Sequence, residues 1–242
     1  MKKHSSLPAV AAALVTLSIA PLHAAIALYD TLVVDFGKTG STTAGNWNNV
    51  AIGASGGTFP LSASGPLLAD MIRYSDGSPT GATLSTTGIT SGNPAGIGGA
   101  TVSAVSASFP VSGSIPSNAQ VDTSFIANGL VTIVIDNLDA AWTYNLTIFS
   151  KLDAARNSQD IVVNGTTLAV DPNDSPYLTT WSNIVPNGSN EIVISFPNAG
   201  VGTSNVLTQH INAFELTAVP EPSVTLFTSL GVLCFLNRRR RF

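Results

Sequence analysis

The grouping of apolar residues between positions 28 and 218 limits the fold of this chain more than any other feature. β-Branched and aromatic residues come in runs of a few positions, and Gly, Asn, Asp, Ser or Pro interrupts each run. No segment of this region repeats apolar residues with the 3.6-residue period of an amphipathic helix. Short runs separated by turn residues are typical of strands in a β-sandwich. We therefore expect an all-β body.

Two segments show the strand pattern most clearly. In 142–150, large apolar residues alternate with mostly polar ones, as in a strand with one buried face. In 161–170, Asn164-Gly165 separates two β-branched runs and supplies the positive φ angles of a two-residue hairpin turn. Further strands are predicted at 31–36, 130–136, 160–164, 191–196 and 210–217, with weaker ones at 67–74 and 82–89. A single sandwich of roughly eight to ten strands fits this length.

The charges exclude one class of partner. Six of the ten basic residues flank the apolar ends of the chain, so residues 28–218 carry four cations against 13 carboxylates, a formal charge of −9. Nucleic acid is not expected to bind such a surface, because phosphate neutralisation needs clustered Lys and Arg. The single Cys, Cys234, cannot form a disulfide within the chain.

Residues 1–27 have the three regions of a secretory signal peptide. Lys2 and Lys3 precede an apolar run from Leu7 to Leu22, and small residues follow it. Ala25-Ile26-Ala27 matches the A-x-A pattern for cleavage after Ala27, and cleavage after Ala24 is the alternative. An exported protein is expected.

The other end, 219–242, has three parts in a fixed order. Val219-Pro220-Glu221-Pro222 is followed by the apolar run Val224–Leu236 and then by Arg238, Arg239, Arg240 and Arg241. As a helix that run would rise about 20 Å, less than the ~30 Å hydrocarbon core, so a weak membrane anchor is implied. The arginines would hold the C-terminus on the cytoplasmic side, and Ala218 to Pro222 is expected to be an extended linker. A plain tail anchor is the simpler alternative.

These three parts resemble the PEP-CTERM sorting signal of Gram-negative bacteria, which membrane enzymes of the exosortase group recognise. The resemblance implies export, transient anchoring in the inner membrane, processing near Pro220-Glu221-Pro222, and delivery to the cell surface or extracellular matrix, often together with polysaccharide production. Val219, Pro220, Glu221 and Pro222 would then form the recognition and processing site, and the four arginines would fix orientation.

A second resemblance covers most of the body. Asp35-Phe36-Gly37, Gly45-Asn46-Trp47-Asn48-Asn49, Asp76 to Gly81, Trp142 to Phe149, Val163-Asn164-Gly165 and Ile211 to Glu215 follow one another in an order that is similar to sandwich domains of PEP-CTERM proteins. Such domains also occur beside bacterial carbohydrate-active enzymes and look like galactose-binding-type jelly rolls. The resemblance implies a jelly-roll β-sandwich, and it transfers no catalytic residues.

Residues suited to catalysis or metal binding are few. His210 is the only His after the signal peptide and lies on a predicted strand, so we expect a structural role for it and no Ser-His-Asp triad. Asp136/Asp139 and Asp171/Asp174 could serve glycoside hydrolysis, but their turn-like surroundings favour capping. No zinc motif is present, and no cofactor is expected. Calcium bound by the loop at Asp171 and Asp174 is an alternative with less support.

Four residues are candidates for ligand binding. A sugar ring has an apolar face that stacks on aromatic side chains, and Trp47 and Trp181 lie in loop-like sequence. For Trp47, a core ring that fills a loop is the favoured interpretation, and an exposed binding ring is the alternative. Arg73 and Arg156 lie near predicted loops and could bind polar groups, although salt bridges are the simpler interpretation.

Together these features predict an exported, non-catalytic protein of the cell surface or extracellular matrix. Its domains would be a signal peptide (1–27), a β-sandwich (28–218) and a sorting tail (219–242). A carbohydrate-binding module of the extracellular polysaccharide is the first alternative, and a glycan or ester hydrolase is the second.

Overall fold

The computed structural model of the protein describes residues 26–38, 42–52, 65–87, 100–101, 103–126, 131–151, 158–197 and 209–220. The strands and the short helix within these residues are β1 (Thr31–Lys38), β2 (Asn48–Ile52), β3 (Gly65–Leu68), β4 (Thr83–Thr87), β5 (Ala100–Thr101), β6 (Ser108–Phe109), β7 (Gly113–Ser114), α1 (Ser117–Val121), β8 (Asp122–Ile126), β9 (Val131–Asp136), β10 (Trp142–Phe149), β11 (Gln159–Val163), β12 (Thr166–Val170), β13 (Leu178–Ile184), β14 (Ile192–Phe196), β15 (Gln209–Ile211) and β16 (Ala213–Pro220). The expected all-β class is confirmed for this part of the chain.

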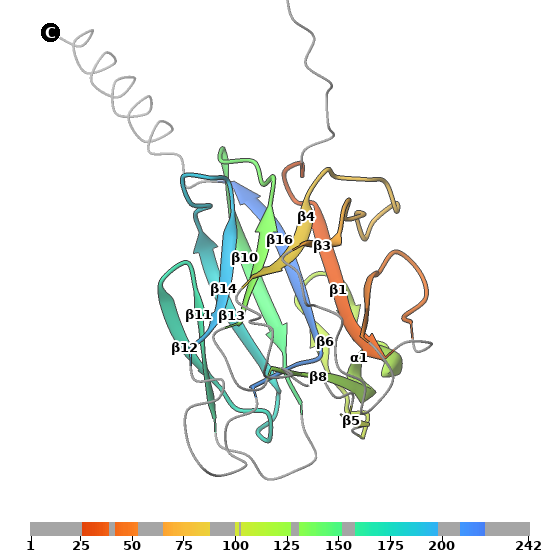
Figure 1. Ribbon diagram of the computed structural model, residues 1–242. Coiled ribbons are helices and arrows are strands. Elements are labelled where there is room, and N and C mark those ends of the chain that lie inside the picture. The colour runs from red at the N-terminus through yellow and green to blue at the C-terminus, as the bar shows by residue number, and fades with distance from the viewer. Residues whose placement is uncertain are drawn as a thin grey trace, which may run out of the picture.

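Two large sheets form the body (Figure 1). A five-stranded sheet has the order β13-β10-β16-β1-β2, and a six-stranded sheet has the order β12-β11-β14-β9-β4-β3. Pairing within them is antiparallel, apart from the parallel pair of β1 and β2. Two smaller sheets, β15-β8-β5 and β6-β7, complete the described part.

The main core lies between the two large sheets. Alternate residues of β1, β10 and β16, such as Leu32, Leu146 and Phe214, are buried there against Ile135 of β9 and Ile194 of β14. Alternation of this kind is what a period of two residues predicts for strands facing a core. The two sheets therefore pack as a β-sandwich.

A second layer covers the outer face of the five-stranded sheet. Val33, Phe149 and Ala213 project from that face and pack against apolar residues of segment 103–120, including Phe109 and Ile115. As a result β16 is buried on both faces over most of its length, and the outer residues of β10 are buried as well. The half-buried strand that the sequence predicts at 142–150 is thus buried on both sides.

Several predicted strands are found. β1, β4, β9, β10, β11 and β14 lie where the sequence predicts strands, and the predicted hairpin has Asn164 at φ 43° and Gly165 at φ 85° between β11 and β12. The expectation of one strand at 210–217 holds except for a break at Asn212, between β15 and β16.

Other expectations are wrong. Residues 67–74 do not form one strand: β3 ends at Leu68, and a turn with a single bridge between Ile72 and Pro79 follows. Trp181, expected in a loop, lies on β13. Ala218 to Pro220, expected to begin a linker, are the last residues of β16, where Val219 and Pro220 pair with Thr143 and Trp142. The backbone groups of β10 continue the ladder there, which sequence periodicity does not reveal.

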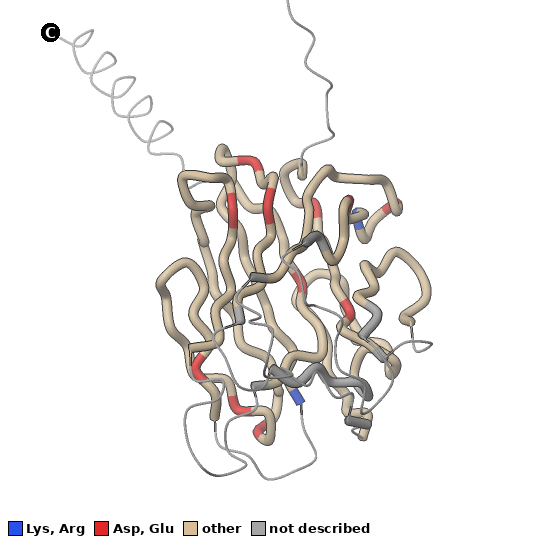
Figure 2. The backbone as a smooth tube through the Cα atoms, in the orientation of Figure 1, with Lys and Arg blue, Asp and Glu red and all other residues tan. Residues whose placement is uncertain are grey.

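Acidic residues occur mainly in the turns at the ends of the strands, and few basic residues accompany them (Figure 2). This distribution agrees with the excess of carboxylates over cations in the sequence.

Candidate functional site

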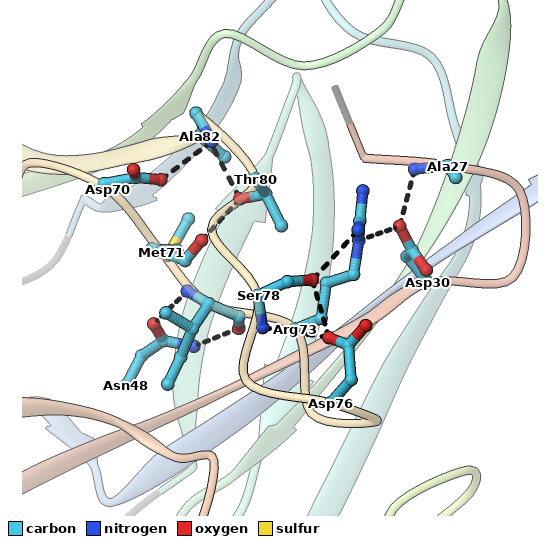
Figure 3. Close-up of polar contacts among 12 residues, drawn as sticks. Ala27, Asp30, Asn48, Asp70, Met71, Arg73, Asp76, Ser78, Thr80 and Ala82 are labelled. Carbon is cyan, nitrogen blue, oxygen red and sulfur yellow. Dashed lines mark hydrogen bonds and ion pairs between the residues drawn. The ribbon is translucent and has the colours of Figure 1, made fainter. Parts of the chain in front are cut away.

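Arg73 belongs to a loop of residues 70–82 that is tied to the N-terminal segment (Figure 3). Its Nε atom lies 2.6 Å from Oδ2 of Asp30 in an ion pair, and its Nη1 donates to Oγ of Ser78 at 3.0 Å. The same Oδ2 accepts the main-chain N–H of Ala27 at 2.7 Å. Arg73 thus makes the salt bridge that the sequence favoured over ligand binding.

The tip of this loop holds a charged carboxylate. Asp76 accepts hydrogen bonds from the hydroxyl of Ser78 at 2.6 Å and from its main-chain N–H at 2.9 Å. The Ser78 side-chain bond and then its backbone bond hold the pKa of the Asp76 carboxyl below its ordinary value. Because Ser78 also accepts from Arg73, the three residues form one polar chain along the loop.

Side-chain groups fix the base of the loop. Asn48 accepts the N–H of Ile72 at 2.7 Å and donates to the carbonyl of Ile72 at 2.9 Å, so its amide takes the place of a neighbouring strand. Thr80 donates to the carbonyl of Met71 at 2.6 Å. These contacts connect the loop to β2 and to the N-terminal segment, while further hydrogen bonds of Arg73, Ser78 and Thr80 lie within the loop.

Trp47 is not an exposed ring. It has 6% of its surface exposed and packs against Phe109, with the ring centroids 6.3 Å apart. It belongs to the second apolar layer, so it supports segment 103–120 and does not offer a stacking face to a sugar. This buried position agrees with the core role that the sequence favours for Trp47 over an exposed binding ring.

Trp181 lies at the opposite edge of the five-stranded sheet, on β13. Its ring is 3% exposed, and Nε1 donates to the carbonyl of Thr166 at 3.0 Å. It lines a cavity of about 320 Å³ between the edge strands β12 and β13. The structure therefore does not bring Trp47 and Trp181 to one groove, and Arg156 lies outside the described residues.

His210 has no exposed surface. The carbonyl of His210 accepts from Oγ of Ser150 at 2.8 Å and from Nε2 of Gln159 at 2.6 Å, while its N–H donates to Oε1 of Gln159 at 2.6 Å. Ser150 and Gln159 thus hold the main chain of β15 in place. The expected structural role of His210 agrees with this burial.

Three carboxylates of the two pairs, those of Asp136, Asp139 and Asp171, have the capping role that the sequence favoured. Asp136 accepts the N–H of Asn137 at 2.6 Å, Asp139 accepts that of Ala141 at 2.9 Å, and Asp171 accepts that of Asn173 at 2.8 Å. Within the part of the chain that the structure describes, no group of three His, Cys, Asp or Glu residues is placed to hold a metal ion.

Three polar residues make long-range contacts that the sequence does not predict. Glu215, which is 2% exposed, accepts the N–H groups of Val111 at 3.1 Å and Ser112 at 2.6 Å. Asn48 holds the 70–82 loop, and Asn164 accepts the N–H of Val193 at 2.8 Å. Their partners lie far away in the sequence. The only local signal for Glu215 is a charged residue within an otherwise mostly apolar strand.

The segments that the sequence predicts to direct export and membrane anchoring lie mainly outside the described residues. Among the described residues, no helix is both long and apolar enough to cross a bilayer. The signal peptide up to residue 25, and Glu221 to Arg241 of the tail, lie outside the described residues.

Comparisons with known proteins add two distant structures. No family model matches the chain, and no curated protein matches it. The crystal structures of the ANX2 ectodomain and of the ANXUR1 extracellular domain, both from Arabidopsis thaliana, are each 14% identical to it and align over 59% of this chain, with TM-scores of 0.39 and 0.38. The aligned part spans about half of those chains, 52% and 50% respectively. Similarity at this level carries no argument about function.

Proposed function

We propose that this protein is an exported, non-catalytic component of the cell surface or extracellular matrix, delivered by a PEP-CTERM sorting tail. A signal peptide directs export, the segment Val224–Leu236 anchors the protein transiently in the inner membrane, and an exosortase-type enzyme processes it near Pro220-Glu221-Pro222. The sandwich, predicted at 28–218 and extending in the structure from Ile26 to the end of β16 at Pro220, is then the part that reaches the surface, and we assign it to the jelly-roll type.

The observation that carries this proposal is the order of the three tail features. A proline-flanked acidic residue, a short apolar run and four terminal arginines follow one another at the C-terminal end of the sequence, and a signal-peptide pattern is present at the other end. Each feature has a distinct physical role: recognition, weak anchoring and orientation.

The position of β16 supports this assignment of roles. Pro220 is exposed and is the last residue of β16, so the motif begins in the last two residues of that strand. A processing enzyme that acts at Glu221 or beyond would release the sandwich with β16 complete.

The test compares two tail variants in the native host. Glu221→Ala leaves the apolar run and the arginines intact, so full-length protein should accumulate in the membrane. Replacing Arg238, Arg239, Arg240 and Arg241 by Ser removes the charge that opposes translocation, so unprocessed protein should escape. Glu191→Ala is the matched control, because Glu191 is a carboxylate in a turn of the body and its loss should leave sorting unchanged.

The decisive measurement is the mass of the protein recovered from the cell surface. A mass that lacks the four arginines agrees with processing. A mass that still includes them, or normal sorting of Glu221→Ala, would show that the tail is a plain anchor.

No observation on the described residues favours the hydrolase alternative, because His210, the only His of the body and the one that a Ser-His-Asp triad would have to use, has no exposed surface. The carbohydrate-binding alternative gains one observation, the cavity beside Trp181.

A further inference from the structure

Among the described residues, the two large sheets both end in an edge strand on one side of the sandwich. β12 is the edge strand of the six-stranded sheet and pairs with β11, while β13 is the edge strand of the five-stranded sheet and pairs with β10. In Figure 1 the two strands lie on the same side of the molecule. Between them is the cavity of about 320 Å³, which we call the β12–β13 pocket. Its size lies at the lower end of the ~300–1,000 Å³ range of small-molecule pockets.

Fixed groups hold the pocket in shape. The Nε1–H of Trp181 donates to the carbonyl of Thr166 and so joins the two edge strands across the side of the sandwich. At the hairpin turn, the amide of Asn164 donates to the carbonyl of Val185 at 2.9 Å. A site held by hydrogen bonds between separate strands is formed before a ligand arrives, which lowers the entropy cost of binding.

A β-bulge forms the rim on the β13 side. The pairing of β10 and β13 shifts between Tyr144 and Leu146, and opposite the shift Asn183 has φ 56°. The main-chain N–H of Asn183 donates to Oδ1 of Asn145 at 3.0 Å, which fixes the bulge. Bulges at sheet edges often redirect a side chain, and here the side chain of Asn183 is exposed at the pocket.

The lining carries no charge. None of the ten described residues that line the pocket has an ionisable side chain, although the body as a whole has a formal charge of −9. A charged ligand would lose hydration here without gaining a counter-charge. The ligand that fits this lining is therefore uncharged.

The polar groups of the lining suit a polyhydroxylated ligand. Thr166, Ser182 and Asn183 are exposed, and within the described part of the chain their side chains make no hydrogen bond. Two hydroxyls and an amide offer both donors and acceptors, as sugar hydroxyls require. Leu168 and the wall at Trp181 provide apolar surface for the C–H groups of a ring. Because Trp181 is 3% exposed, it serves as a wall and not as an open stacking face.

We infer that the β12–β13 pocket binds an uncharged sugar unit. This inference goes beyond the proposed sorting function and is independent of the tail, since it uses residues of β12, β13 and their turns alone. A site on the side of the sandwich would also remain accessible after the C-terminal tail is processed.

Binding can be measured by saturation-transfer NMR and calorimetry on the full chain. The full chain includes the apolar run Val224–Leu236 and is kept in detergent. This detergent must lack a sugar head group, because such a head group would itself be a ligand. The probes are glucose, galactose, mannose and N-acetylglucosamine, each alone and as a short oligosaccharide, with glucuronate and galacturonate as charged counterparts. At least one neutral sugar should bind. The two uronates should bind at least about tenfold more weakly than that sugar.

Matched variants locate the site. Asn183→Gly deletes the amide and keeps the positive φ, because glycine adopts this conformation freely, and it should weaken binding about tenfold. Asn190→Gly is the control, since Asn190 is also exposed with φ 65° but does not line the pocket, and it should bind as the parent protein does. Thr166→Arg places a long charged side chain at the rim and should abolish binding.

Three results would each overturn the inference. They are no binding of any neutral probe, equal binding of the uronates, and equal weakening by Asn183→Gly and Asn190→Gly. Sorting of the protein to the surface is measured separately by mass, so a failure of this inference leaves the proposed function standing, and the converse also holds.

Discussion

Replacing Glu215 should release segment 103–120 from the sandwich before the whole domain unfolds. Glu215 is 2% exposed at the centre of the five-stranded sheet, and its two carboxylate oxygens accept the N–H groups of Val111 at 3.1 Å and Ser112 at 2.6 Å. These bonds hold the turn between β6 and β7 against the sheet. Val33 and Thr147 are its direct neighbours on β1 and β10, and neither can replace the carboxylate as an acceptor of two N–H groups.

The size of the effect follows from opposing contributions. A hydrogen bond to a charged group contributes about 1.5–3 kcal/mol, so the two bonds amount to roughly 3–6 kcal/mol. Part of this is offset because the variant no longer buries a charge. Val111 is 58% exposed, so water can reach its N–H once the carboxylate is gone. For Glu215→Ala we therefore expect a loss of about 2–4 kcal/mol in the free energy of unfolding.

Glu215→Gln should have an intermediate effect. The amide oxygen can still accept one N–H, but the amide NH2 then faces the second N–H, donor against donor. A loss of about 1–2 kcal/mol is expected.

Two measurements on the full chain check this reasoning. Urea denaturation gives the free energy of unfolding, and amide hydrogen exchange at Ser112 reports local release of the turn. Trp47, which packs against Phe109 of this segment, should shift its fluorescence to longer wavelength at lower urea than Trp181, which lies in the other core cluster.

Glu191→Ala is the control variant, since Glu191 accepts from the side chain of exposed Asn187 at 2.9 Å and a change within about 0.5 kcal/mol is expected. A loss below about 0.5 kcal/mol for Glu215→Ala, or unchanged exchange at Ser112, would refute the idea that this carboxylate holds the segment.

Three further predictions follow from single features. Ile26 is 1% exposed in the core, so a chain that begins at Ala25 should be about 2–4 kcal/mol more stable to urea than one that begins at Leu28. We accordingly expect the mass of the exported protein to match cleavage after Ala24; a mass matching cleavage after Ala27, with no loss of stability, would contradict this role of Ile26. Ser78→Ala should raise the pKa of Asp76 toward its ordinary value in an NMR titration, because the largest stabilisation of that carboxylate comes from the Ser78 hydroxyl, and an unmoved titration would show that another group sets the pKa. Aggregation measured by light scattering should increase as pH falls from 7 to 4, because protonation removes the negative charge of a body with a formal charge of −9, and equal solubility at both values would count against charge as the source of solubility.

The sequence alone determined the features that depend on near neighbours. The alternation in 142–149 predicts β10, and Asn164-Gly165 predicts the β11–β12 hairpin, because both patterns act within a few residues. The all-β class follows from the same local signals. The expectations for the tail and the signal peptide also come from short patterns, and they stay predictions.

Tertiary structure alone decided which residues act together. β13 escaped prediction because, as an edge strand with a bulge, it buries only Trp181 and Ile184, and this breaks the two-residue period. Trp47 and Glu215 gained their roles from segment 103–120, which covers a sheet face that the sequence suggests is half-exposed. The β12–β13 pocket exists because the edge strands of two different sheets lie side by side. Packing between distant segments determines such contacts, and no local period encodes it.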